Sequence, residues 1–167
     1  MPRPGTAGKE EAREGGAIIC EFVSWIKKDK KVYFLTGTQV FDSSKGEALR
    51  RWCASPYEDD YAGHGAIRWF YGLEEREGVN RECSNFSAPK NFPAVIARAI
   101  KSGEMRGLGI PPGLHTPAAQ AEYDRVCAPA LAEYGVYVVT QAEYKHFKQA
   151  AFWDLFAKPE NRIEAWR

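Results

Sequence analysis

A repeated tripeptide, Ala-Glu-Tyr, is the feature of this chain that most restricts its fold. Its three copies begin at Ala121, Ala132 and Ala142. The first two are eleven residues apart, close to three turns of an α-helix, so their side chains return to nearly the same face. The repeat therefore predicts helices with a shared surface in the C-terminal third. It supplies no chemical group suited to catalysis.

The N-terminal part has a different pattern. Two β-prone runs, residues 18–26 and 32–36, flank a charged turn and predict an antiparallel hairpin. Residues 1–15 are polar and contain Gly, Pro and Glu, so we expect a flexible lead-in. A chain of 167 residues is one domain by size, and no linker divides it. We expect a single α+β domain over residues 16–167, mainly helical, with a small antiparallel sheet near the N-terminus.

Start and stop signals predict the helices of the middle part. Ser44 and Glu47 have capping-box spacing and open the first helix. A second helix begins near Gly65 and closes at Gly72. A third begins with Pro93 in its first turn and ends at Gly103. Residues 73–90 are charged and polar and are expected to form a loop.

The C-terminal part is predicted to hold two longer helices. Thr116 caps the first, and Pro129 lies inside its apolar stripe, which predicts a kink or a break there. Residues 136–139 are expected to add a short strand. Thr140 and Glu143 form a second capping box that opens the last long helix. A final turn is expected to end at Trp166.

Composition limits the classes of function. The net charge of +1 disfavours direct nucleic-acid binding, which needs a strong positive excess. The four cysteines form no CxxC pair, so a zinc knuckle is disfavoured and buried thiols are expected. No segment has the pattern of a signal peptide or of a membrane span. The sequence therefore predicts a cytoplasmic protein without membrane contact.

The sharpest candidate for a ligand site precedes the second helix. Asp59, Asp60, His64 and Arg68 fall within ten residues, with a glycine on each side of the histidine. Glycine lets the backbone approach a ligand, and a helix start attracts an anion. The simpler interpretation is a helix entry, in which His64 bonds a backbone carbonyl and Arg68 makes a surface ion pair. Both interpretations remain open at this point.

Other candidates for chemistry are weaker. His115 lies beside a predicted N-cap, where a role in the loop is expected, and His146 is expected on an exposed helix face. Three histidines without paired spacing predict no metal site. The Gly107-Leu108-Gly109 segment lacks the remaining residues of a dinucleotide or phosphate loop. No catalytic residue, metal ligand or cofactor is predicted.

Two surfaces are candidates for binding a partner. Trp69 points away from the core side of its helix and stands beside Arg68, whereas Trp52 fits the core side of its own helix. Acidic and tyrosine residues recur through the repeat and form a second candidate surface: Glu122, Tyr123, Glu133, Tyr134 and Glu143. The simpler interpretation of that surface is a solvated helix face. The sharper one is a surface that mimics nucleic acid or meets a basic groove.

Several segments carry a resemblance. They are the unit from Glu122 to Tyr134, the runs Gly63–Arg68 and Asn85–Pro93, and the ending Asn161–Arg167. Together they resemble a group of small uncharacterised phage and prophage proteins with AEYxxVxAPAxAEY units. The resemblance implies a phage origin and transfers no catalytic residue. Small phage proteins of this kind often bind and block host factors, including CRISPR effectors, which is an inference from origin alone.

These observations lead to one expected function and one alternative. The expected function is a phage-encoded protein that inhibits a host factor, such as a bacterial defence complex, by protein–protein contact in the host cytoplasm. The alternative is an enzyme or sponge for a small phosphorylated or nucleotide-like ligand held around Asp59, His64 and Arg68. The sequence leaves the oligomeric state open.

Overall fold

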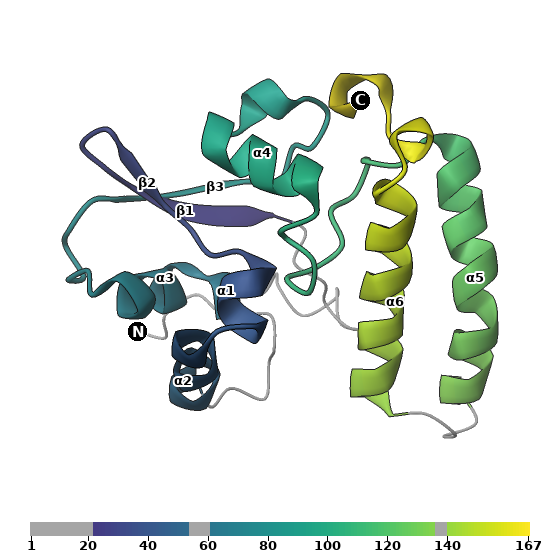
Figure 1. The fold of residues 1–167 in the computed structure, drawn as a ribbon, viewed down its shortest axis with the longest axis horizontal. Helices are drawn as coiled ribbons and strands as arrows, with labels where there is room; N and C mark the ends of the chain where they lie inside the picture. Colours follow the sequence, from purple (N-terminus) through teal and green to yellow (C-terminus); the bar gives the residue numbers. More distant parts are fainter. Residues whose placement is uncertain (1–21, 54–60, 136–139) are drawn as a thin grey trace, which may run out of the picture.

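One three-stranded antiparallel sheet forms the centre of the molecule. The structure is a computed structural model that describes residues 22–53, 61–135 and 140–167. Its strands are β1 (Val23–Lys28), β2 (Lys31–Tyr33) and β3 (Val79–Cys83), in the order β2-β1-β3 (Figure 1). Helices make up most of the rest, so the predicted α+β class with a small sheet is confirmed. The expected lead-in over residues 1–15 lies outside the described residues.

The predicted hairpin is confirmed; β1 runs two residues past the expected end at residue 26, and β2 is shorter than the expected run over residues 32–36. β1 pairs with β2 from Ile26↔Tyr33 to Lys28↔Lys31. Asp29 in the turn has φ 55, a left-handed conformation that Asp adopts more readily than most residues. Residues 18–21 of the expected first strand lie outside the described residues.

The third strand corrects the prediction of a loop over residues 73–90. β3 pairs with β1 in antiparallel register from Val23↔Cys83 to Lys27↔Val79. The first four residues of β3 are all exposed: Val79, Asn80, Arg81 and Glu82. The strand therefore lacks the alternation of apolar and polar residues that predicts a β-strand from sequence. Backbone hydrogen bonds to a buried neighbour hold this edge strand in place.

Helices α1 (Gly37–Phe41) and α2 (Ser44–Cys53) follow the hairpin. α1 was not predicted, although Thr36 and Gln39 form the capping box that starts it. The predicted cap of α2 is one residue off. The backbone N–H of Gly46 donates to Ser43 Oγ at 2.9 Å, so Ser43 caps the helix in place of Ser44.

Helices α3 (His64–Tyr71) and α4 (Ala94–Ser102) agree with the sequence signals. Gly72 and Gly103 end them at φ 65 and φ 80, left-handed conformations suited to glycine. A 3₁₀ turn, η2 (Pro89–Asn91), precedes α4. α4 lies on one side of the sheet, and α1 and α3 lie on the other (Figure 1).

Helices α5 (Pro117–Gly135) and α6 (Gln141–Phe156) pack side by side in antiparallel directions (Figure 1). Both predicted caps are present, since Thr116 Oγ1 accepts from the Ala119 N–H and Thr140 forms its capping box with Glu143. The break considered at Pro129 does not occur, because α5 continues through it. Proline removes one helical hydrogen bond, and packing against α6 outweighs that loss. The strand expected at residues 136–139 lies outside the described residues.

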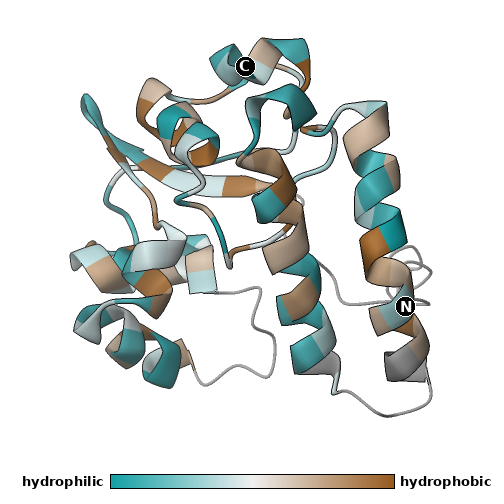
Figure 2. Cartoon of the chain, turned by 45° about the vertical axis from the view of Figure 1, so that its right-hand side comes forward, coloured by the Kyte–Doolittle hydropathy of each residue, from teal (hydrophilic) through white to brown (hydrophobic). Residues whose placement is uncertain are grey.

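Two hydrophobic clusters fill the interior, and Figure 2 shows the hydropathy of the elements that build them. We call them the small and the large cluster. The small cluster lies between β1 and the helices α1, α2 and α3; its members are Ile26, Leu35, Val40, Leu49, Ala66, Ile67 and Phe70. The large cluster joins the other face of β1 to α4, α5, α6 and the C-terminal turns η3 (Pro159–Asn161) and η4 (Glu164–Trp166); its members include Trp25, Phe86, Phe92, Ile96, Ile100, Tyr123, Cys127, Phe152, Trp153, Phe156 and Trp166.

Candidate functional site

His64 is engaged with the sheet. It is the first residue of α3, and its Nε2 lies 2.8 Å from the carbonyl oxygen of Arg81 in β3. That ring nitrogen donates to the carbonyl, as the simpler interpretation of this segment proposed. Asp59 and Asp60, the acidic members of the candidate ligand site, lie outside the described residues.

Arg68 is also used by the protein itself. Its guanidinium donates to the backbone carbonyls of Glu74 and Glu77, the latter at 2.7 Å, and to Asn80 Oδ1 at 2.8 Å. These bonds tie the loop between α3 and β3 back onto α3, in place of the predicted ion pair. Because His64 and Arg68 both direct polar atoms at the chain's own carbonyls, the geometry weighs against the phosphorylated-ligand interpretation.

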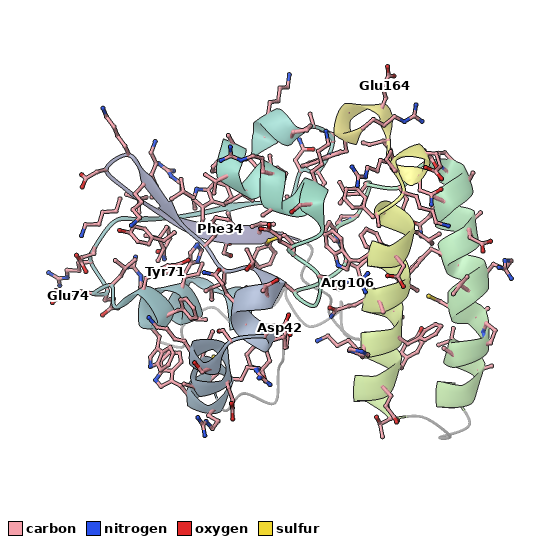
Figure 3. All side chains as sticks on the ribbon, in the orientation of Figure 1. Phe34, Asp42, Tyr71, Glu74, Arg106 and Glu164 are labelled. Atoms are coloured by element: carbon pink, nitrogen blue, oxygen red, sulfur yellow. The ribbon has the colours of Figure 1, made fainter. Side chains whose placement is uncertain are left out.

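Tyr71 reinforces the same region. Its hydroxyl donates to the Phe34 carbonyl at 2.8 Å and accepts from Gln39 Nε2 at 3.1 Å (Figure 3). α3 is thereby anchored to the sheet and to α1. The outer face of α3 is left to carry a surface.

A stacked tryptophan pair joins α2 to α3, and its Trp69 also packs against the small cluster. The rings of Trp52 in α2 and Trp69 in α3 have centroids 5.5 Å apart and an interplanar angle of 23°. Trp52 is 52% exposed, whereas Trp69 is half-buried. The prediction that Trp52 belongs to the core is therefore wrong, because α2 buries Gly46 and Leu49 instead. The signal was present in the sequence, since both tryptophans follow arginines.

Arg51 directly precedes Trp52 in α2. Arg51 is exposed and approaches Glu47 at 4.0 Å, a pair that contributes little on a surface. Its neighbour Arg50 is half-buried, because its Nε donates to the Val40 carbonyl at 3.1 Å. We call Trp52, Trp69 and Arg51 the aromatic patch. A large exposed ring of this kind is typical of the energetic centre of protein interfaces.

The acidic, tyrosine-bearing face is assembled differently from the prediction. Tyr123 is only 8% exposed, packs against Phe152, and belongs to the large cluster; burial raises its pKa. Its place on a partner-binding face is thus a correction. Glu122 accepts from Arg125 Nη2 at 2.6 Å, and that hydrogen bond lowers the pKa of Glu122.

Glu143 also has a structural task. Its carboxylate accepts from the Thr140 N–H at 2.7 Å in the capping box of α6, and this bond lowers the pKa of Glu143. The side chains of Glu133 and Tyr134 lie outside the described part of the structure. Of the glutamates on the predicted acidic face, the structure therefore describes the side chains of Glu122 and Glu143. Both accept hydrogen bonds from residues three positions away in their own segment.

His115 lies in the core and not in a loop exposed to solvent. It is 6% exposed, its ring stacks on Phe152 with centroids 4.2 Å apart, and its Nε2 lies 3.1 Å from the Phe152 carbonyl. Its Nδ1 is buried without a partner among the described residues, and burial lowers the pKa of the ring. His146, in contrast, is exposed on α6 as predicted.

The thiols follow the expectation of burial in part. Cys127 is buried and burial raises its pKa, while Cys53 and Cys83 are half-buried; none of these three is part of a disulfide. Cys20 lies outside the described residues. Within residues 22–53, 61–135 and 140–167, no group of three metal-ligating side chains comes together. None of the helices described is long and apolar enough to cross a bilayer.

Comparison with known proteins finds no matching family model, no matching curated protein and no matching solved structure. The candidate site must therefore be judged on its own geometry.

Proposed function

We propose that this chain is a binding protein that acts by direct contact with another protein, through the aromatic patch. The exposed ring of Trp52, stacked on the half-buried ring of Trp69, carries the proposal. Leaving a large apolar ring more than half in water forgoes the gain that burial would bring. Tryptophan and arginine are also the residues most enriched among those that dominate binding energy.

The helices around the patch support its role as a preformed surface. His64, Arg68 and Tyr71 pin α3 to β3, to its own loop and to the hairpin. Trp69 is therefore held on a fixed helix before a partner covers it. Preorganisation of this kind lowers the entropic cost of association.

The proposed target is a host factor, such as a bacterial defence complex, met in the cytoplasm of an infected bacterium. The resemblance of several segments to small phage and prophage proteins supports this target. One of these segments, Gly63–Arg68, forms the first part of α3 and leads directly to Trp69. The resemblance to phage proteins thus supports the proposed inhibition of a host factor, and the aromatic patch supports the proposed mode of contact.

The test is capture of partners from bacterial lysate by the tagged chain, followed by affinity measurement with the purified partner. The variant is Trp52→Ala combined with Trp69→Ala, and the control is Phe147→Ala, an apolar residue 41% exposed on α6. We expect the double variant to weaken binding by roughly thirtyfold or more, and the control to leave it unchanged. Equal affinity of all three folded proteins would remove the aromatic patch from the proposal.

A further inference from the structure

His115 connects α5 to the rest of the large cluster. It lies two residues before α5 begins, and its backbone forms an isolated antiparallel bridge with Arg162, directly after η3. Its ring is in contact with both long helices: it stacks on Phe152 of α6, and it meets Tyr123 of α5 in an edge arrangement with centroids 6.2 Å apart. The ring is therefore a shared contact of the two helices near the start of α5.

The contacts of this ring suit only its neutral form. Nε2 lies 3.1 Å from the Phe152 carbonyl oxygen, so Nε2 carries the ring proton and donates a hydrogen bond. Nδ1 is then an acceptor, and it is buried without a partner among the described residues. A proton at Nδ1 would create a buried N–H group without an acceptor, on a ring that then carries a charge. Both changes cost free energy in an apolar surrounding.

The groups that face the ring do not compensate such a charge. α5 contributes Tyr123, whose hydroxyl stays neutral because burial raises its pKa, and α6 contributes two rings and a carbonyl. The segment after α6 contributes the buried Arg162, whose guanidinium lies 4.7 Å from the ring centroid of Phe156. Phe156 also stacks with His115. Within the described residues, no carboxylate pairs with His115 or Arg162, so a charged His115 would add to a positive charge that is already buried.

α5 is also the helix that the fold holds least firmly. It lies at the edge of the molecule, beside α6 (Figure 1). The buried side chains that the structure describes on α5 are Ala119, Tyr123 and Cys127. Pro129 lacks the N–H group that would bond to the preceding turn. A peripheral helix with few buried side chains opens at a lower free energy than the unfolding of the whole domain.

We propose that His115 is an acid-sensitive latch for α5. In its neutral form the ring holds the start of α5 against α6. When Nδ1 takes up a proton, the ring leaves its buried place for water, and α5 opens while the sheet and the small cluster remain folded. Burial lowers the pKa of His115, so the open state binds the proton more readily than the closed state. A fall in pH therefore favours the open state.

The test is amide hydrogen exchange of the full chain at pH 7 and pH 5.5, each at several low urea concentrations. We expect the amides of Tyr123 and Cys127 in α5 to exchange through an opening that depends weakly on urea. The amides of β1 should depend strongly on urea, because they require exposure of the whole core. Between pH 7 and pH 5.5 the opening constant of α5 should rise by up to about eightfold, the increase expected when only the open state has an ordinary histidine pKa.

Two variants assign the pH dependence to one ring. His115→Phe keeps a ring against Phe152 and should reduce the rise to less than about twofold, whereas His146→Gln, on the exposed side of α6, should retain it. A rise of the same size in His115→Phe would overturn the role of His115. Equal urea dependence of α5 and β1 in the original chain would overturn the separate opening of α5, and this comparison does not depend on the folding of any variant. None of these outcomes bears on the aromatic patch, which is tested by partner capture.

Discussion

The two hydrophobic clusters of this protein are built in different ways. The small cluster draws all its members from one continuous part of the chain, from Ile26 to Phe70. The large cluster joins residues from Val23 to Trp166, including contacts such as that of the Trp166 indole N–H with the Phe86 carbonyl at 2.7 Å. Local patterns can therefore specify the first, whereas the second requires the chain to close long loops.

The clusters also differ in their polar content. Around the large cluster, His115 and Arg162 are buried, and both bond backbone carbonyls of α6, Arg162 Nε doing so with Phe156 at 2.7 Å. The small cluster contains no buried charged side chain among the described residues. The large cluster therefore combines apolar burial with hydrogen bonds that leave unpaired groups when broken.

The segment between α4 and α5 joins the two regions. The Gly37 N–H at the start of α1 donates to the Glu104 carbonyl at 2.7 Å, and Leu108 packs against both clusters. Arg106 forms an ion pair with Asp154 of α6, in the same part of the molecule (Figure 3).

The largest expected effect tests whether a buried side chain of the large cluster contributes more to the free energy of unfolding than one of the small cluster. Trp166→Ala should lower the free energy of unfolding by about 4 kcal/mol, because it empties a fully buried site and leaves the Phe86 carbonyl unpaired. Leu49→Ala, in the small cluster, should cost about 3 kcal/mol. Urea unfolding measures both, with Leu131→Ala, 53% exposed, as a near-neutral control. A greater loss for Leu49→Ala than for Trp166→Ala would reverse the ranking.

A smaller effect is expected at the junction between the clusters. A Cβ at Gly37 would lie 1.7 Å from the Arg106 carbonyl oxygen, so Gly37→Ala must push α1 away from the α4–α5 segment. We expect a loss of about 1–3 kcal/mol in urea unfolding. The matched control is Gly65→Ala, also in a helix, where a Cβ meets nothing within 4 Å. That variant should gain up to about 1 kcal/mol, and a loss of equal size at both glycines would contradict the close approach at Gly37.

The smallest effect concerns pH and belongs to the large cluster alone. Burial lowers the pKa of His115 below its ordinary value of 6.5. Below pH 6.5 the unfolded chain therefore binds a proton that the folded chain does not, so stability contributed by neutral His115 is lost as the pH falls toward its folded pKa. Arg162 and Tyr123, which lie next to the ring in the fold, add a fixed positive charge and a neutral hydroxyl.

Unfolding measured from pH 7.5 to 5 checks this expectation. His115→Phe keeps a ring against Phe152 and should flatten the decline on the acid side, whatever its effect at neutral pH. His146→Gln, on the exposed side of α6, is the control and should retain the decline. An identical acid-side slope in the original chain and in His115→Phe would show that His115 is not responsible.

Signals that act within one turn of the chain were predicted from the sequence. Thr116 and Thr140 cap their helices, and Gly72 and Gly103 end theirs, because each of these groups bonds or bends the backbone within a few residues. The capping box of α1 at Thr36 and Gln39 was equally local and was missed. The displacement of the α2 cap to Ser43 shows the usual error of one residue at a helix end.

The candidate site was only partly predictable. The sequence singled out Trp69 and placed His64 and Arg68 at a helix entry, because their spacing around Gly63 and Gly65 is local. It assigned Trp52 to the core, and it listed Tyr123 on a candidate binding surface although Tyr123 also fits the apolar stripe of its helix; the structure exposes Trp52 and buries Tyr123. Trp52 and Tyr123 each fit the apolar stripe of a helix. The stripe alone does not determine which of its two edges another element of the fold will cover.

The sequence by itself determined the hairpin, the helices from α2 to α6 and most of their caps, because periodicity and capping act over one or two turns. Tertiary structure alone decided that β3 joins the sheet and that Trp52 stacks on Trp69. Each of these depends on packing between segments distant in the chain, and the free energy of such packing is a property of the assembled elements and not of any local pattern.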